Sequence, residues 1–425
     1  MIKNLREIFS KIELNWIDTK SDLSESNEYS QLILIFPNLT KIFENGRIED
    51  KEEFQRTLQH IFRLFKVFFL ILDGKFIHES LSNESIELIR EKVIHQYSVN
   101  ELLLPLVLMY HDIGRFENKK DHPYYGYYLI TEEKLLDLFE LSDIEKLLIK
   151  KTIQYHLLFA TIYTGESTFY GLYSLLNDTE FTELLNNNQN IKKFIDLLEI
   201  FTYIDILGYS YARIYDHYIK YYSEINDKLN NILSLWPDKD KALNLALDYS
   251  QEWLEWRIAG ALRIFQYIGT KPYLTRDFYF KKIYESADKN IEQLFNLTGW
   301  QAISEYYLID CSKIQMKYGL AMVMLLAFGT FFRGPIKEDA KISNNLLIFW
   351  ILLSEEIKKK SSEDQGYLWN VHFLGLPNWV KWDRKFKNEL NYHTLSKIIK
   401  NSKQEFEVLK KEFNVYLDFT SVFNS

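Results

Sequence analysis

A single cysteine, Cys311, occurs in the 425 residues, and this scarcity excludes several classes of site. No internal disulfide can form, and neither a zinc ribbon nor a CxxC redox site can be built without paired cysteines. The opening residues 1–18 mix charges with apolar residues at helical spacing, unlike the continuous apolar core of a signal peptide. We therefore expect a reducing compartment and a cytoplasmic protein.

Long apolar runs and an excess of positive charge are also lacking. Two apolar runs, 318–332 and 346–353, fall short of the roughly 20 residues that a membrane helix needs, so we expect buried core helices and no membrane contact. The 51 Lys and Arg stand against 59 Asp and Glu, which gives a net charge of −8. A broad nucleic-acid-binding surface is therefore not expected, although a local basic pocket remains compatible with this charge.

Proline and glycine are scarce as well, with 7 and 15 residues. Segments such as 84–97 and 191–222 carry apolar residues at three-and-four spacing, which is typical of amphipathic helices. At 267–272 a Gly and then a Pro follow such a segment, the usual signals of a helix end. We find no strand alternation of useful length. The sequence predicts an all-α fold.

The chain is longer than a usual single domain, so we divide it into three parts. These are an N-terminal helical segment, 1–72, a central unit, 73–225, and a C-terminal helical region, 226–425. The last part carries no recognisable motif. This region could serve as a lid, a sensor or a dimer surface, and the sequence does not choose among these roles. Whether the protein forms a homo-oligomer is equally undecided by the sequence.

Residues 110–130, YHDIGRFENKKDHPYYGYYLI, combine several groups that bind metals or phosphates. The preceding apolar segment predicts a helix that Gly114 stops, so His111 and Asp112 fall on its last turn. They are about 100° apart around the axis and can lean toward one point beyond the helix end. Imidazole and carboxylate together suit a borderline or hard divalent metal.

Further candidate ligands surround this pair in the sequence: His78 upstream, and His122, His156 and Asp205 downstream. Asp205 is the most telling, because a carboxylate within so apolar a helix needs a cation or donors to offset its desolvation. The stretch HDIGR, the stretch HPYYGYYLI and the late Asp within an apolar helix resemble the HD-domain superfamily of metal-dependent phosphohydrolases. The resemblance covers roughly 78–215 and implies an HD-domain-like helical bundle with additional N- and C-terminal helical regions.

The resemblance also implies roles for these residues. His78, His111, Asp112 and Asp205 would hold one metal ion, and His122 and His156 would add a second, with Asp112 bridging. One or two divalent ions, of Mn, Mg, Co, Fe or Zn, are therefore expected. Arg115 follows the His-Asp turn and is expected to act with His111 and Asp112 in catalysis, as a positive charge for a phosphate. Lys119 and Lys120 are read as a solvated basic loop.

The first ligand has a rival in His95, which lies nearer to His111 in the sequence. Two antiparallel helices joined by a short turn would bring the start of the first helix beside the end of the second, where His111 lies. His95 would then fall at the far end, roughly 18 Å away. This geometry favours His78.

Other chemistries have less support. The sequence has no GxxxxGK[ST] phosphate loop, no GxSxG elbow and no HExxH zinc helix. A tryptophan cluster could stack on a base, but clusters of this kind usually pack in the protein core. Its members are Trp369, Trp379 and Trp382. We therefore expect a metal-dependent phosphohydrolase that acts on a small phosphate substrate, a nucleotide or a related ester. An HD-type di-iron oxygenase and a noncatalytic helical scaffold with a structural metal remain as alternatives.

Overall fold

A computed structural model describes residues 1–119, 121–164, 166–210, 214–250, 313–317, 345–360, 367–375, 391–407 and 411–423 of the chain. The chain divides into two compact units. The first comprises residues 1–160 and 179–237, and the second comprises residues 161–178 and 238–425. The first 72 residues thus belong to the same unit as the segment that contains the His-Asp turn.

The first unit is helical. Its helices are α1 (Ile2–Ser10), α2 (Leu14–Thr19), α3 (Asn27–Ile35), α4 (Thr40–Glu49), α5 (Lys51–Leu72), α6 (Asn83–Val99), α7 (Leu103–Tyr110), α8 (His122–Glu132), α9 (Asp143–Gln154), α12 (Phe181–Leu185), α13 (Asn188–Leu207) and α14 (Asp216–Leu233), and the boundary between the units falls within α10 (Leu158–Thr164).

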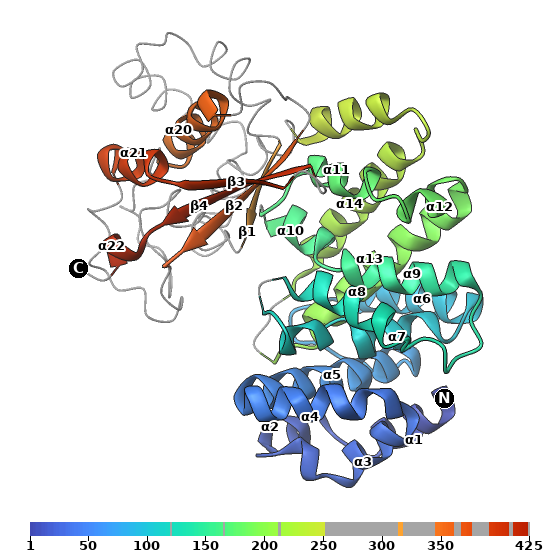
Figure 1. Cartoon of the computed structure of the whole chain (residues 1–425). Coiled ribbons are helices and arrows are strands. Elements are labelled where there is room, and N and C mark those ends of the chain that lie inside the picture. The colour runs from blue at the N-terminus through green and yellow to red at the C-terminus, as the bar shows by residue number, and fades with distance from the viewer. Residues whose placement is uncertain are drawn as a thin grey trace. The chain divides into compact units, whose positions relative to one another are not determined.

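Helix α5 is the centre of this unit. Asp50 caps its start by accepting a hydrogen bond from the backbone N–H of Glu53 at 3.0 Å, and Gly74 follows its end with a φ of +68°, a value that suits glycine. One side of α5 contacts the N-terminal helices α1, α2 and α4, and α6, α7 and α13 also pack against it (Figure 1). Because α5 is covered on both sides, polar side chains on it, among them Glu53 and His60, are also buried.

Helix α13 is buried along most of its length and packs against α5, α6, α7 and α14. The segment 191–222, which reads as one periodic pattern, forms two helices. The chain turns at Gly208, whose N–H donates to the carbonyl of Ile204 at 2.8 Å. This turn places Asp205 in the last turn of α13, close to α5.

The all-α prediction is confirmed in part, and the second unit contains the departure from it. The protein is mostly helical, but strands β1 (Ile314–Lys317), β2 (Leu368–Leu374), β3 (Lys403–Glu407) and β4 (Glu412–Asp418) form a sheet of order β1-β2-β4-β3. β1, β2 and β4 are parallel, and β3 is antiparallel to β4. The described helices of this unit include α11 (Leu172–Leu176), α20 (Asn345–Lys360), α21 (Tyr392–Lys400) and α22 (Thr420–Phe423), and residues 239–250 are helical as well.

Strand β2, one of the two inner strands of the sheet, escaped prediction because it does not alternate. Residues 368–371 of β2 are buried on both faces, so the polar-apolar pattern of a half-exposed strand is absent. Trp369 lies on this strand and is 3% exposed, which favours packing over stacking on a ligand. Trp379, Trp382, the run 318–332 and the helix end at 267–272 lie outside the described residues.

The apolar run 346–353 lies in α20, where Phe349 and Leu353 are fully buried. Among the described helices, none combines the length and the apolar character that crossing a membrane requires.

Candidate metal centre

The His-Asp pair lies where α7 ends. All eight residues of α7 are buried, and His111 follows as its C-terminal cap. Asp112 then begins a 3-10 turn, Ile113–Phe116. His111 and Asp112 are 1% and 4% exposed, so both polar side chains point into the unit and not into solvent. Buried polar groups of this kind need partners.

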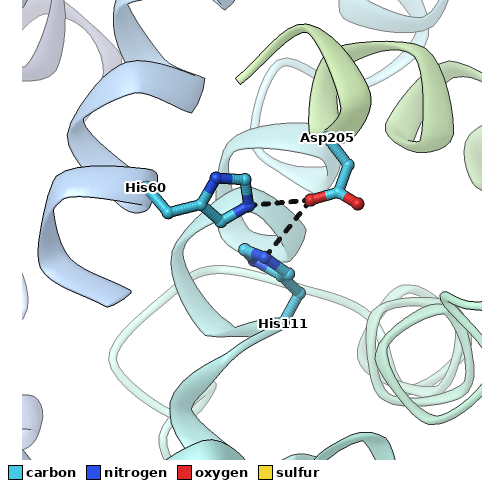
Figure 2. Close-up of side chains that lie close together, drawn as sticks. All are labelled: His60, His111 and Asp205. Carbon is cyan, nitrogen blue, oxygen red and sulfur yellow. Dashed lines mark hydrogen bonds and ion pairs between the residues drawn. The ribbon is translucent and has the colours of Figure 1, made fainter. Parts of the chain in front are cut away.

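One set of partners for His111 comes from two distant helices. His60 of α5 and Asp205 of α13 lie beside His111, and the three ligand atoms are close enough to hold a metal ion. Oδ1 of Asp205 is 2.8 Å from Nε2 of His60 and 3.7 Å from Nε2 of His111. Figure 2 shows this carboxylate oxygen directed at both imidazole rings.

Asp112 has partners of its own. It forms a second group with His122, the first residue of α8, and His156, which follows α9. Oδ1 of Asp112 is 3.2 Å from Nε2 of His122, and the Nε2 atoms of His122 and His156 are 3.2 Å apart. The other oxygen of Asp112, Oδ2, is 3.6 Å from Nε2 of His111. Asp112 therefore links the two groups through its two oxygens.

Hydrogen bonds to the backbone fix the tautomer of three of these histidines. Nδ1 of His111, His122 and His156 lies 3.1, 3.1 and 2.7 Å from the carbonyls of Leu108, Lys119 and Ile153. Because a carbonyl only accepts, each Nδ1 carries a proton, so in the neutral form of the ring it is Nε2 that presents the lone pair. This is the usual arrangement of metal-binding histidines.

The Nε2 atoms show why a cation fits. Nε2 of His111 is buried and has no hydrogen-bond partner. Nε2 of His122 and of His156 face each other at 3.2 Å, and in the neutral Nδ1–H tautomer both present lone pairs there. A bound cation would satisfy all three atoms, and the carboxylates of Asp112 and Asp205 would balance its charge.

The ionisation states favour the same interpretation. Burial alone would raise the pKa of the Asp112 carboxyl, but His111, His122 and Arg115 outweigh burial and hold that pKa well below its usual range. Burial likewise opposes ionisation of Asp205, and the hydrogen bond from His60 outweighs it, so the pKa is lowered. Burial lowers the pKa of His156 to about 3. At neutral pH the carboxylates are charged and His156 is neutral, the forms in which they bind metals.

Arg115 borders the centre through Glu53. Its Nε donates to Oε1 of Glu53 at 2.8 Å and lies 3.8 Å from Oδ2 of Asp112. Burial opposes the charge of Arg115, but Asp112 and Glu53 outweigh burial and raise its pKa, so the guanidinium stays charged. Lys119 is half exposed and pairs with Asp50 at 2.9 Å and with Glu53 at 3.1 Å. Lys120 lies outside the described residues.

The first ligand requires a correction, because His60 and not His78 lies beside His111 and Asp205. His78 lies in the loop between α5 and α6 and belongs to neither group of described residues. Its Nδ1 accepts from the backbone N–H of Ser80 at 3.3 Å, and its ring stacks on Phe76. The rival His95 is exposed on α6. Pairing α6 with α7 was the wrong premise, because the histidine comes from α5.

The sequence does carry a signal for His60. His60 lies three residues after Thr57 and one before Ile61, on a helix whose apolar residues recur at helical spacing. It is therefore a polar residue on the buried face of that helix. That is the criterion that singled out Asp205.

Gly114 brings the His-Asp turn against α8. A Cβ atom placed there would meet the carbonyl oxygen of His122 at 2.1 Å and the backbone nitrogen of Gly126 at 2.4 Å. Gly114→Ala is therefore expected to destabilise the protein by about 1–3 kcal/mol and to displace His122, which weakens metal binding. Gly126→Ala is the matched control, because its nearest contact is a side-chain methyl group of Ile153 at 3.3 Å. Thermal unfolding and metal titration of both variants check this, and equal stabilities would contradict it.

Comparisons with known proteins give no relatives: the chain matches no protein-family model, no curated protein and no solved structure. Function is therefore inferred from the residues themselves.

Proposed function

We propose that this protein is a metal-dependent phosphohydrolase of the HD type that acts on a nucleotide or a related phosphate ester. One observation carries the proposal. Asp112 joins two buried groups, His60, His111 and Asp205 on one side and His122 and His156 on the other, in which carboxylate oxygens face Nε2 atoms. With His60 in the first place, the order His, His-Asp, His, His, Asp resembles that of the HD-domain superfamily.

Each residue has a distinct part in this proposal. His60, His111, Asp112 and Asp205 would hold one divalent ion, and His122, His156 and Asp112 would hold a second. Such ions lower the pKa of bound water and neutralise phosphoryl oxygens. The backbone bonds of His111, His122 and His156 keep the Nε2 lone pairs directed inward before any ion arrives. The chain needs no nucleophilic side chain of its own, because water attacks phosphorus.

Arg115 would provide a fixed positive charge for the phosphate. Glu53 holds its Nε, and the position beside Asp112 places the guanidinium next to the centre. Guanidinium groups bind phosphate oxygens through several N–H donors in a fixed geometry. The same proposal includes a small phosphate substrate and a cytoplasmic location. It includes no broad nucleic-acid surface, and it leaves open whether the protein forms a homo-oligomer.

The test is a turnover assay of the full chain, first stripped with a chelator and then loaded with Mn, Mg, Co, Fe or Zn. Nucleotide mono-, di- and triphosphates and phosphodiesters are offered, and phosphate release is measured beside oxygen consumption. We expect hydrolysis of at least one ester only after metal is restored, and no uptake of oxygen.

Other outcomes would refute the proposal in distinct ways. Oxygen uptake by the iron-loaded protein without hydrolysis would favour the di-iron oxygenase. A metal that binds and raises the melting temperature while no ester is hydrolysed and no oxygen is consumed would favour the structural role. Hydrolysis that persists after complete removal of metal would contradict the role of the centre altogether.

A further inference from the structure

His60 differs from the other three histidines of the centre in how its ring is held. Those three each donate from Nδ1 to a backbone carbonyl. Nδ1 of His60 is buried and has no hydrogen-bond partner. Its Nε2 donates to Asp205 at 2.8 Å, since a carboxylate only accepts. An ion bound through Nε2 would replace that hydrogen bond, so no hydrogen bond would then fix the rotation of the ring.

A tyrosine ring contacts His60 instead. The ring of Tyr209 stacks on the imidazole with centroids 4.0 Å apart and an interplanar angle of 19°. The imidazole also meets the ring of His111 edge-on, at 5.4 Å and 67°. The imidazole of His60 is thus in contact with two rings, stacked on Tyr209 and at a steep angle to His111. Stacking contacts of this kind resist rotation of the ring because the face contact is lost when the plane tilts.

The backbone that carries Tyr209 is fixed to the same helix as His60. Nε of Arg63, three residues after His60, donates to the carbonyl of Gly208 at 2.7 Å. Both oxygens of Asp18 hold the guanidinium of Arg63 at 2.7 Å. At Gly208 the approach is close, because a Cβ atom there would lie 3.2 Å from Cε1 of His60 and 2.4 Å from a methyl carbon of Leu64. The turn after α13 therefore packs directly against α5 at the position of His60.

We infer that Tyr209 is a positioning residue of the metal centre: its stacked ring, anchored through Gly208 and Arg63, orients His60 in place of the backbone hydrogen bond that the other three histidines have. This inference rests on the proposed metal centre. It assigns no contact with substrate to Tyr209. The phenolic oxygen is not needed for the role, whereas the aromatic ring is.

The experiment titrates the full chain with Co²⁺, whose absorption spectrum reports on its ligands, and identifies the binding step that His60→Ala removes. Tyr209→Leu should weaken that step by about 10-fold or more, the usual effect of losing a group that orients a ligand. Tyr209→Phe should keep it within about 2-fold of the unmodified protein, because the stacked ring stays. Arg63→Met, which releases Gly208 without changing either ring, should weaken it in the same direction.

Tyr416→Leu is the matched control. Tyr416 stacks on His372 with centroids 4.7 Å apart and an interplanar angle of 17°, and His372 belongs to neither metal-ligand group of the described residues. This variant should bind Co²⁺ like the unmodified protein. Unchanged binding by both Tyr209→Leu and Arg63→Met would overturn the role of Tyr209 and leave the proposed function intact. An unmodified protein that binds no Co²⁺ would instead refute the metal centre, and the inference with it.

Discussion

Asp112→Ala is expected to lower phosphate-ester turnover and bound metal by more than about 100-fold, beyond the loss typical of groups that merely orient a ligand. Asp112 contacts both ligand groups, with Oδ2 near His111 and Oδ1 near His122. Its loss removes the carboxylate that the two groups share. Metal content after dialysis and turnover on the phosphate panel are the measurements. The fold should survive, because the apolar core of α5, α7 and α13 does not depend on metal.

Asp121→Ala is the control for this variant. Asp121 is exposed, nine residues further along, and precedes α8 without a capping bond from its side chain. We expect it to keep metal and turnover. If Asp112→Ala hydrolysed esters at the normal rate while free of metal, the mechanism would be wrong. If it unfolded, the centre would have a structural role.

Glu199→Ala is expected to destabilise the first unit by about 2–4 kcal/mol, the range for removing one member of a buried, hydrogen-bonded charge network. Glu199 of α13 is 1% exposed. Its oxygens accept from Lys92 of α6 at 2.9 Å, from the Tyr203 hydroxyl at 2.7 Å and from Asn226 of α14 at 2.7 Å. The substitution removes the nearest acceptor of these donors, and the fully buried Tyr203 hydroxyl keeps the more distant carbonyl of Ile219, at 3.4 Å. Chemical denaturation measures the loss.

Glu91→Ala on the exposed face of α6 serves as the comparison and should change the free energy of unfolding by less than about 0.5 kcal/mol. Since Asp205 lies on the same helix as Glu199, we also expect Glu199→Ala to weaken metal binding. A Glu199→Ala protein as stable as Glu91→Ala would show that the network contributes nothing to holding α13 in place.

Some residues of the candidate centre could be predicted from the sequence, because the residues next to them in the chain identify them. Asp205 stands out as a carboxylate in an apolar helix, and the helix end at His111 follows from the apolar run before it. The choice of His78 failed because it needed knowledge of which helices pack together. Which of two helices contacts a third depends on packing over the whole unit, and α5 precedes α7 by a complete intervening helix, α6.

The sheet shows the same limit in another form. β2 and β4 pair over seven residues although 44 positions separate each residue from its partner, so local spacing in the sequence does not reveal the pairing. β3 and β4 are closer in sequence, but β3 is largely exposed, and its Lys, Gln and Glu residues resemble a polar loop. Periodicity therefore misses strands that are buried on both faces, as much of β2 is, or largely exposed, as β3 is. β4 differs from both, because Val415 and Leu417 are buried between more exposed neighbours, so its alternation was a signal that the sequence did carry.

The distance along the chain between His60 and Asp205 also affects synthesis of the protein. Their side chains meet in the folded unit, yet 145 positions separate them. At roughly 5–20 residues per second, a ribosome needs about 7–30 s to make the intervening chain. During that interval the nascent protein carries His60 and then His111, Asp112, His122 and His156, but not the last carboxylate. An ion captured at this stage would have an incomplete set of ligands until α13 docks against α5.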